Sequence, residues 1–156
     1  MIIPSRSPSL KGLFVLYTGG MMLPAFEEIE HTADLALRVR GQNLSELFRN
    51  AALGMLSLLH VEPLPGGSEY RSFILLGEDS ETLLVSWLEE LLFPLEVEDA
   101  VVVDFQVEVL DKVQLKATIE LMKIASIKQE IKAITFNELD IRSTEFGFEK
   151  IVVFDV

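Results

Sequence analysis

Two alternating runs of apolar residues, one directly after the other, restrict the possible folds of this chain most strongly. In residues 103–109 every second residue is valine or phenylalanine, and Asp104, Gln106 and Glu108 stand between them. Residues 113–121 repeat the alternation. Because successive side chains of a strand point to opposite faces, each run predicts a strand with one buried face. The short link Leu-Asp-Lys at 110–112 predicts that the two strands form a β-hairpin.

Two other segments carry apolar residues at helical spacing. The first stripe covers residues 44–59 and follows Asn43, a preferred N-cap residue, with a glutamate three positions after the cap. The second helix is expected to begin near Asp79 or Ser80 and to end around Pro94, because proline disrupts a helix interior. Its leucines and its tryptophan are expected to pack in the core.

Further strands are expected at residues 35–40, 70–76, 130–141 and 149–156, where alternating or continuous apolar residues stand between turn residues. The order of elements is then β-α-β-α-β-β-β-β. Strands that follow one another through short links favour an antiparallel sheet. The sequence therefore predicts an α+β fold, a two-layer sandwich with a largely antiparallel β-sheet and two helices on one face, built as one domain over residues 26–156.

Residues 1–25 differ in composition from the rest of the chain. They contain two basic residues and no Asp or Glu, whereas residues 26–156 carry 11 basic against 25 acidic residues. The apolar run at 13–17 is too short for a membrane span or a secretory signal. We expect either an N-terminal extension or, by preference, an upstream start that precedes a natural start at Met21 or Met22. With no other targeting signal, the expected location is the cytoplasm.

The composition excludes several kinds of chemistry. The 156-residue chain has no Cys, and its two histidines are His31 and His60, so disulfides, thiol nucleophiles, Cys-ligated zinc and multi-histidine metal centres are excluded. Its formal net charge is −12, which argues against direct binding to a nucleic-acid backbone. Carboxylates, lysines and hydroxyls remain as the functional groups.

Carboxylates break the apolar pattern at two places. Glu-His-Thr-Ala-Asp at 30–34 stands before the strand at 35–40, and Asp155 lies in the apolar segment that ends with Val156. If Asp34 lies near Asp155 in the sheet, two side chains and the α-carboxylate of Val156 supply oxygen donors for a divalent cation, Ca²⁺, Mg²⁺ or Mn²⁺. The alternative at 30–34 is a turn whose Asp or Thr bonds to nearby backbone N–H groups.

Lys132 is a third departure from the pattern. In a strand of period two, Lys132 would share a face with Ile134 and Phe136, which places a cation on an apolar side. A functional role and a structural one both remain open. In the structural reading, Lys132 lies on an edge strand or bulge and extends its ammonium group to water.

Taken together, these segments resemble the archease family over about residues 26–156. Five motifs in the same order carry the resemblance. The first motif is Glu-His-Thr-Ala-Asp at 30–34, and the second is a helical pattern with Leu-Phe at 47–48, Ala-Ala at 51–52 and Gly-Met at 54–55. The third is Trp-Leu-Glu-Glu-Leu-Leu at 87–92. The last two are Ile-Lys-Ala-Ile-Thr at 131–135 and Val-Val-Phe-Asp-Val at 152–156.

The resemblance implies an accessory protein of an RtcB-type tRNA-splicing ligase, which joins RNA ends with GTP and Mn²⁺. It implies that the protein promotes guanylylation and multiple turnover of the ligase and reaches tRNA only through it. The resemblance also implies a divalent-cation site, described as calcium, at Asp34, Asp155 and Val156. Lys132 matches a functionally important lysine of the family, and His31 is expected to contact the partner.

The chain departs from the family pattern at two points. Phe136 and Asn137 stand where many relatives have Tyr-His, and Phe148 is the nearest aromatic residue where a tryptophan often precedes the last strand. Two other functions remain open. A metal-dependent phosphoester hydrolase would use the same carboxylates with Lys132 as an electrophile, and a general chaperone or modulator of protein interactions would need no metal. The sequence leaves the oligomeric state open.

Overall fold

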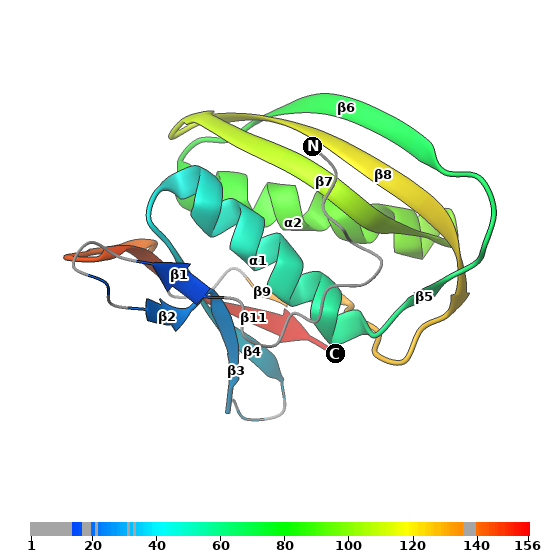
Figure 1. Ribbon diagram of the computed structural model, residues 1–156, viewed down its shortest axis with the longest axis horizontal. Coiled ribbons are helices and arrows are strands. Elements are labelled where there is room, and N and C mark those ends of the chain that lie inside the picture. The colour runs from blue at the N-terminus through cyan, green and yellow to red at the C-terminus, as the bar shows by residue number, and fades with distance from the viewer. Residues whose placement is uncertain (1–13, 17–19, 21, 31, 33, 136–139) are drawn as a thin grey trace.

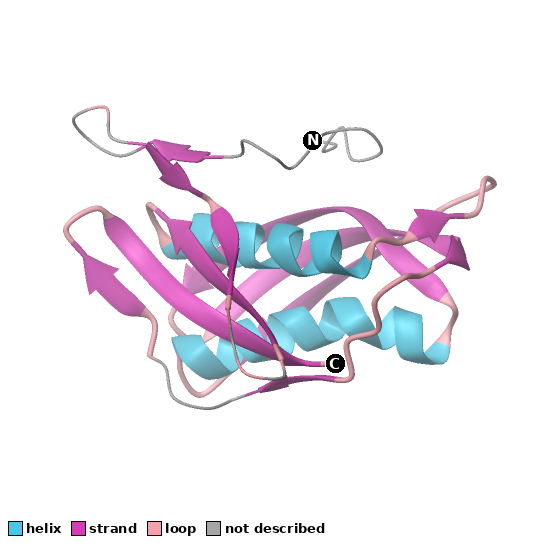
Figure 2. Ribbon diagram, turned by 90° about the horizontal axis from the view of Figure 1, so that it is seen from below, coloured by secondary structure: helices cyan, strands magenta, loops and turns pink. Residues whose placement is uncertain are grey.

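The alternating strands and the two apolar helix stripes assemble into an α+β sandwich with both helices between two antiparallel sheets (Figure 1; Figure 2). The computed structural model describes residues 14–16, 20, 22–30, 32, 34–135 and 140–156. In chain order the elements are β1 (Phe14–Leu16), β2 (Met22–Pro24), β3 (Phe26–Ile29), β4 (Leu35–Gly41), α1 (Leu44–Leu59), β5 (Glu62–Pro63), β6 (Glu69–Leu76), α2 (Ser80–Val97), β7 (Ala100–Asp111), β8 (Gln114–Ser126), β9 (Ala133–Thr135), β10 (Arg142–Thr144) and β11 (Gly147–Asp155).

The strands divide into two principal sheets. In the first, the order is β10-β11-β4-β3, with β9 also paired to β11. In the second, β8 lies between β6 and β7, and β5 pairs with the end of β8. α1 contacts β4 of the first sheet and β7 of the second. α2 contacts β9 of the first sheet and β7 of the second, so each helix packs against both sheets. The α+β class and the largely antiparallel pairing are confirmed. The alternation of side chains did not reveal the division into two sheets.

The predicted strand at 130–141 is not continuous among the described residues. β9 pairs with the end of β11, where Val153 lies opposite Thr135, and β10 pairs with its beginning, where Arg142 lies opposite Glu149. Both short strands therefore lie along one side of β11, one after the other. Residues 136–139, which include the Phe-Asn departure, lie outside the described residues.

α2 continues past the expected end at Pro94. It runs to Val97, and the Glu98 N–H donates to the Pro94 carbonyl at 2.9 Å. The missing N–H of a proline would have bonded to the carbonyl of residue 90 in the preceding turn. Glu90 is exposed, so water can reach that part of the helix and the proline is tolerated one turn before the end. No helix of the described chain is long and apolar enough to cross a membrane.

Part of the expected N-terminal extension packs against the domain. β1 and β2 form an antiparallel pair, and Val15 and Ala25 are buried beside Phe26 and Phe146. The Arg40 guanidinium donates to the Pro24 carbonyl at 3.1 Å. The position of the natural start stays a prediction.

The N-terminus of α1 has the cap that the sequence predicts. Asn43 Oδ1 accepts the Glu46 N–H at 2.9 Å, and Glu46 Oε1 accepts the Gln42 N–H at 3.0 Å.

Replacing Asn43 by alanine is expected to destabilise the protein by about 1 kcal/mol, because an orphan helix donor loses its acceptor. For a chain of this size the melting temperature falls by about 2–4 °C. Differential scanning calorimetry measures the change. Asn43→Asp, which keeps the oxygen, is the control, and equal melting of Asn43→Ala and the parent would contradict the prediction.

The core lies around α1 and α2, with Trp87 at its centre. Its side chain is fully buried, and Nε1 donates to the Phe48 carbonyl of α1 at 3.0 Å. Its ring lies 5.6 Å from the ring of Phe105 and 6.3 Å from that of Phe73, both on the second sheet. Trp87 therefore joins α2 to α1 and to one sheet, as expected of a core residue.

Candidate functional site

The end of β11 lies beside the beginning of β4. Phe154, which is completely buried, pairs with Leu35, the first residue of β4. The next residues beyond this pair are Asp155, the last residue of β11, and Asp34, which directly precedes β4. The register thus brings the backbone positions of the two aspartates to the same end of the β4–β11 pair, which is the proximity that the sequence analysis assumed.

Lys132 lies on the other side of the same strand end. Asp155 pairs with Ala133 of β9, and the Lys132 N–H donates to the Asp155 carbonyl at 2.8 Å. Lys132 is exposed, whereas Ile131 and Ile134 are buried. The expectation that Lys132 shares an apolar face with Ile134 is wrong, because β9 begins only at Ala133 and the backbone before it does not follow the period of two. Phe136 lies outside the described residues.

The residues that precede β4 border a hollow on the surface. Its volume is about 780 Å³ and three carboxylates line it. The lining residues are Glu28, Ile29, Glu30, Thr32, Asp34 and Leu35. Asp34 and Val156 are half-buried and Asp155 is exposed, so solvent reaches these groups. His31, expected to contact a partner, lies outside the described residues.

The donor types at this corner fit a hard divalent cation. Within the described ranges, no three side chains of His, Cys, Asp or Glu are grouped to hold a metal ion. The set expected from the sequence has two such side chains, Asp34 and Asp155, and takes its third group from the α-carboxylate of Val156. All three groups are carboxylates, and oxygen donors suit Ca²⁺, Mg²⁺ and Mn²⁺ better than softer metals.

Ion pairs on the first sheet hold β4 between its neighbours. Arg40 Nη1 lies 2.7 Å from Glu27 Oε2 of β3, and Arg40 Nε lies 3.3 Å from Glu149 Oε2 of β11. Arg38 Nη1 lies 3.5 Å from Glu27 Oε1. Because the Arg40 side chain is only 11% exposed, water screens these pairs less than it screens fully exposed ones. They support the β4–β11 register, which ends at Phe154 and Leu35, next to Asp155 and Asp34.

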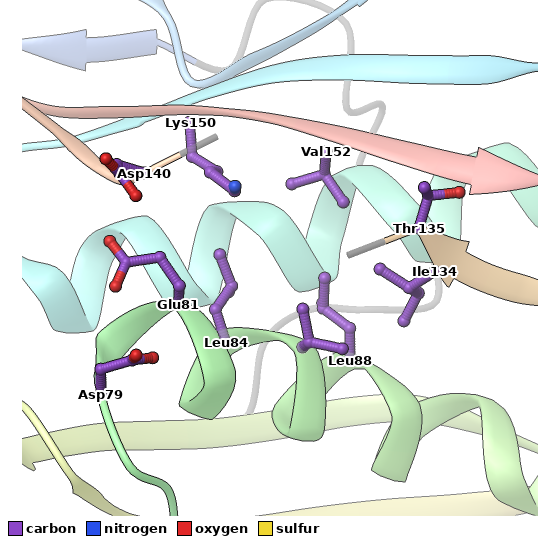
Figure 3. A pocket seen from close by; sticks show the side chains of 10 residues that line it. Asp79, Glu81, Leu84, Leu88, Ile134, Thr135, Asp140, Lys150 and Val152 are labelled. Atoms are coloured by element: carbon purple, nitrogen blue, oxygen red, sulfur yellow. The ribbon is translucent and has the colours of Figure 1, made fainter. Parts of the chain in front are cut away.

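A cleft between α2 and the strands β9 and β11 contains polar residues that the sequence analysis did not single out as a site (Figure 3). Its volume is about 260 Å³. Asp79, Glu81, Asp140 and Lys150 supply its charged groups, and Figure 3 shows Leu84 and Leu88 forming the apolar side on α2. The cleft therefore has an apolar side and a charged end.

Two of the carboxylates in this cleft have structural roles. Asp79 caps α2, and the hydrogen bond from the backbone N–H of Thr82 at 2.7 Å is the main cause that lowers the Asp79 pKa below its ordinary value. Glu81 Oε2 accepts the Ile141 N–H at 2.9 Å. Lys150 is detectable in the sequence, because it stands two positions before the buried Val152 and therefore shares its face of β11. Glu81 is not detectable in this way, because it was expected on the polar side of the helix.

A strong ion pair also lies outside the candidate site. Arg71 of β6 bonds to Glu98 through both terminal nitrogens, with Nη1 to Oε2 at 2.8 Å, and to Glu69 at 2.6 Å. These hydrogen bonds lower the pKa of Glu98 and Glu69, Arg71 being the main cause for each. The arrangement joins the end of α2 to the second sheet.

Comparisons with known proteins extend over most of the chain. The model of the Archease protein family matches residues 26–156. Protein archease of Methanosarcina mazei is 34% identical over 139 residues, which cover 84% of this chain and 95% of that protein. Protein archease of Archaeoglobus fulgidus is 37% identical and covers 82% of this chain and 96% of its own length. The matched region begins at β3 and includes both sides of the candidate site.

Two solved structures have the same fold. The solution structure of protein 1598 of Methanobacterium thermoautotrophicum has a TM-score of 0.61 and 28% identity, covering 85% of this chain and 99% of that one. The crystal structure of a Thermotoga maritima archease, described as a possible chaperone, has a TM-score of 0.62 at 21% identity, covering 83% of this chain and 96% of the other. The family model and the curated relatives together show that this chain belongs to the archease family.

Proposed function

We propose that this protein activates an RtcB-type RNA ligase, promotes the GTP-dependent guanylylation of the ligase and allows it to turn over repeatedly. Membership of the archease family supports an accessory role. The observation that favours the proposal most is the position of β11 between β4 and β9. Asp34 directly precedes β4, Asp155 ends β11 and Lys132 directly precedes β9, so the backbone positions of all three lie at one corner of the sheet.

In this proposal, Asp34, Asp155 and the α-carboxylate of Val156 bind a divalent cation, in the first place Ca²⁺ and otherwise Mg²⁺ or Mn²⁺. Three carboxylates held at one sheet corner repel one another, and a bound cation relieves that repulsion. The cation fixes the geometry of the corner. Lys132 and His31 then contact the ligase near its nucleotide site, where the exposed Lys132 ammonium group supplies positive charge.

The net charge favours contact of this protein with the ligase over contact with RNA. A chain with a net charge of −12 is attracted to the basic surface of a protein that binds RNA and is repelled by RNA itself. The ligase would therefore hold the tRNA, and the accessory protein would reach it only through the ligase, in the cytoplasm.

The proposal is tested by ligase guanylylation and multiple-turnover ligation, each with and without this protein. Lys132→Ala is expected to reduce the stimulation about tenfold or more, because the variant loses the exposed cation beside Asp155. Its melting temperature should stay within about 2 °C of the parent, since an exposed side chain contributes little to stability. Lys128→Ala, an exposed lysine in the preceding loop, is the matched control and should stimulate fully.

Full stimulation by Lys132→Ala would contradict the role of this lysine. No stimulation of any RtcB-type ligase by the parent protein would contradict the proposal as a whole, and phosphoester turnover by the isolated protein would instead support a hydrolase.

The description of the Thermotoga maritima archease as a possible chaperone favours a second candidate function. A chaperone would suppress aggregation of client proteins without a metal ion. Suppression that persists in excess chelator and in Asp155→Asn would support this function over ligase activation.

A further inference from the structure

One edge of the second sheet is exposed, apolar and regular. β6 pairs with β8 along one side, and no strand of the described chain pairs with its other side (Figure 1). Its eight residues pair with β8 without a register shift. Tyr70 is 58% exposed, Ile74 59% and Leu76 72%. With Ser72, these residues occupy every second position, so they share the face that points away from the helices.

The opposite edge of the same sheet has the features that normally prevent strands from pairing between molecules. β7 contains two register shifts in its pairing with β8. Glu108 and Asp111, both exposed, add negative charges along it. Bulges and charged side chains protect an edge strand, as do proline and lysine. β6 has no bulge, proline or lysine, and its two charged residues, Glu69 and Arg71, lie in its first half and bond to each other, so this edge is less protected than that of β7.

The backbone of β6 is also oriented for pairing. The Gly77 N–H, directly after β6, donates to the Val113 carbonyl beside β8 at 2.8 Å. Because bonded and non-bonded pairs alternate along an antiparallel ladder, the odd-numbered residues of β6 bond to β8. The N–H and C=O groups of the even-numbered residues then point to the free edge. The side chains of these residues, Tyr70, Ser72, Ile74 and Leu76, are also exposed.

We propose that β6 is a dimer interface, where it pairs in antiparallel fashion with β6 of a second copy about a two-fold axis at Ser72. In this register Tyr70 lies opposite Ile74 of the second copy and Ile74 opposite its Tyr70. An aromatic residue opposite a β-branched one is a favourable cross-strand pair. The two sheets then become one continuous sheet, and the two-fold axis closes the assembly at two chains.

The charge on β6 permits this approach although each chain has a net charge of −12. The charged residues of the strand are Glu69 and Arg71, which bond to each other at 2.6 Å, and Arg71 also bonds to Glu98 beside the strand. A second copy therefore meets one excess carboxylate at one end of this edge and no charged residue between Ser72 and Leu76, and its own β6 offers the same alternation of apolar side chains.

The interface lies away from the candidate site. Figure 1 shows β6 on the outer side of the second sheet, with both helices between it and the C-terminal end of β11. A dimer through β6 leaves both candidate sites accessible, so ligase activation and dimer formation can succeed or fail independently.

The absence of cysteine from the chain allows a direct test of the register. In Ser72→Cys the two thiols face each other across the axis, at a backbone separation suited to a disulfide. Mild oxidation should give a covalent dimer with the candidate site unchanged. Leu110→Cys, on the other edge strand, is the control and should stay monomeric on a non-reducing gel. A crosslink that forms equally with Leu110→Cys, or fails to form with Ser72→Cys, would contradict the proposed pairing.

Sedimentation equilibrium then measures the assembly. The parent should approach twice the 17.5 kDa chain mass as its concentration rises. Ile74→Lys should raise the dimer dissociation constant about tenfold or more, because each interface gains two charges. Leu110→Lys should leave the dimer dissociation constant within about twofold of that of the parent.

If Ile74→Lys does not fold, Leu76→Lys is used in its place. A parent that stays monomeric at about 0.5 mM, a mass that grows beyond two chains, or equal weakening by Leu110→Lys would overturn the proposal.

Discussion

Calcium is expected to raise the melting temperature of the protein, and Asp155→Asn is expected to remove most of that rise. A ligand that binds only the folded state at one hundred times its dissociation constant stabilises that state by about 2.7 kcal/mol. For a chain of this length, that corresponds to a rise in melting temperature of about 5–10 °C. An amide in place of Asp155 lowers the affinity by about one hundredfold, so the rise should shrink to about 1 °C at the same calcium concentration.

Two further variants and a control make this result specific. Asp34→Asn should act like Asp155→Asn, and one glycine added after Val156 should weaken calcium binding by moving the α-carboxylate. Asp99→Asn is the matched control, since Asp99 is exposed in the link between α2 and β7 and asparagine tolerates its φ of 52°. Calorimetric titration with Ca²⁺, Mg²⁺ and Mn²⁺ compares the metals. Equal calcium shifts in the parent and in Asp155→Asn would refute the site.

Trp87→Ala should destabilise the protein by about 4 kcal/mol. The substitution leaves a large cavity between the helices and the second sheet, and large-to-small changes of this kind cost about 3–5 kcal/mol. The protein also loses the hydrogen bond to the Phe48 carbonyl and the ring contact with Phe105. Urea unfolding followed by circular dichroism at the helix bands measures the loss, because the chain has no other tryptophan to report by fluorescence.

Two variants separate packing from the hydrogen bond. Trp87→Phe keeps an aromatic ring in the core but loses the Nε1 donor, so the expected cost is smaller than that of Trp87→Ala. Phe93→Ala removes an aromatic side chain from the exposed side of the same helix, where Phe93 is 50% exposed, and should cost less than about 1 kcal/mol. If Trp87→Ala cost no more than Phe93→Ala, the central role of Trp87 would be wrong.

The sequence predicts elements well where one local rule determines them. Asn43 and Asp79 cap the two helices, because a side-chain acceptor at that position satisfies helix donors whatever the tertiary structure. Period-two alternation likewise predicts β7 and β8. Alternation shows which residues face the core, but not which strand pairs with which. Alternation therefore could not predict that the strands form two sheets with the helices between them.

The candidate site shows the same limit. Asp34 attracts attention because it stands directly before a strand, and Asp155 because it interrupts an apolar segment, but only the β4–β11 register shows that both lie at the same end of that strand pair. The face of Lys132 was predicted wrongly because a period of two was assumed outside β9. Glu81 was missed since its partner, the Ile141 N–H, is a backbone group that no side-chain pattern reveals.

The pairing of β4 with β11 joins segments from nearly opposite ends of the chain. Contacts between residues so distant in sequence require closure of a long loop before they contribute any stability, and this slows folding. β6, α2, β7 and β8, by contrast, follow one another closely in the chain. We therefore expect the second sheet and its helix to form first and the corner of Asp34 and Asp155 to form late. A folding intermediate would expose the apolar edge of β6 before the protein acquires its candidate site.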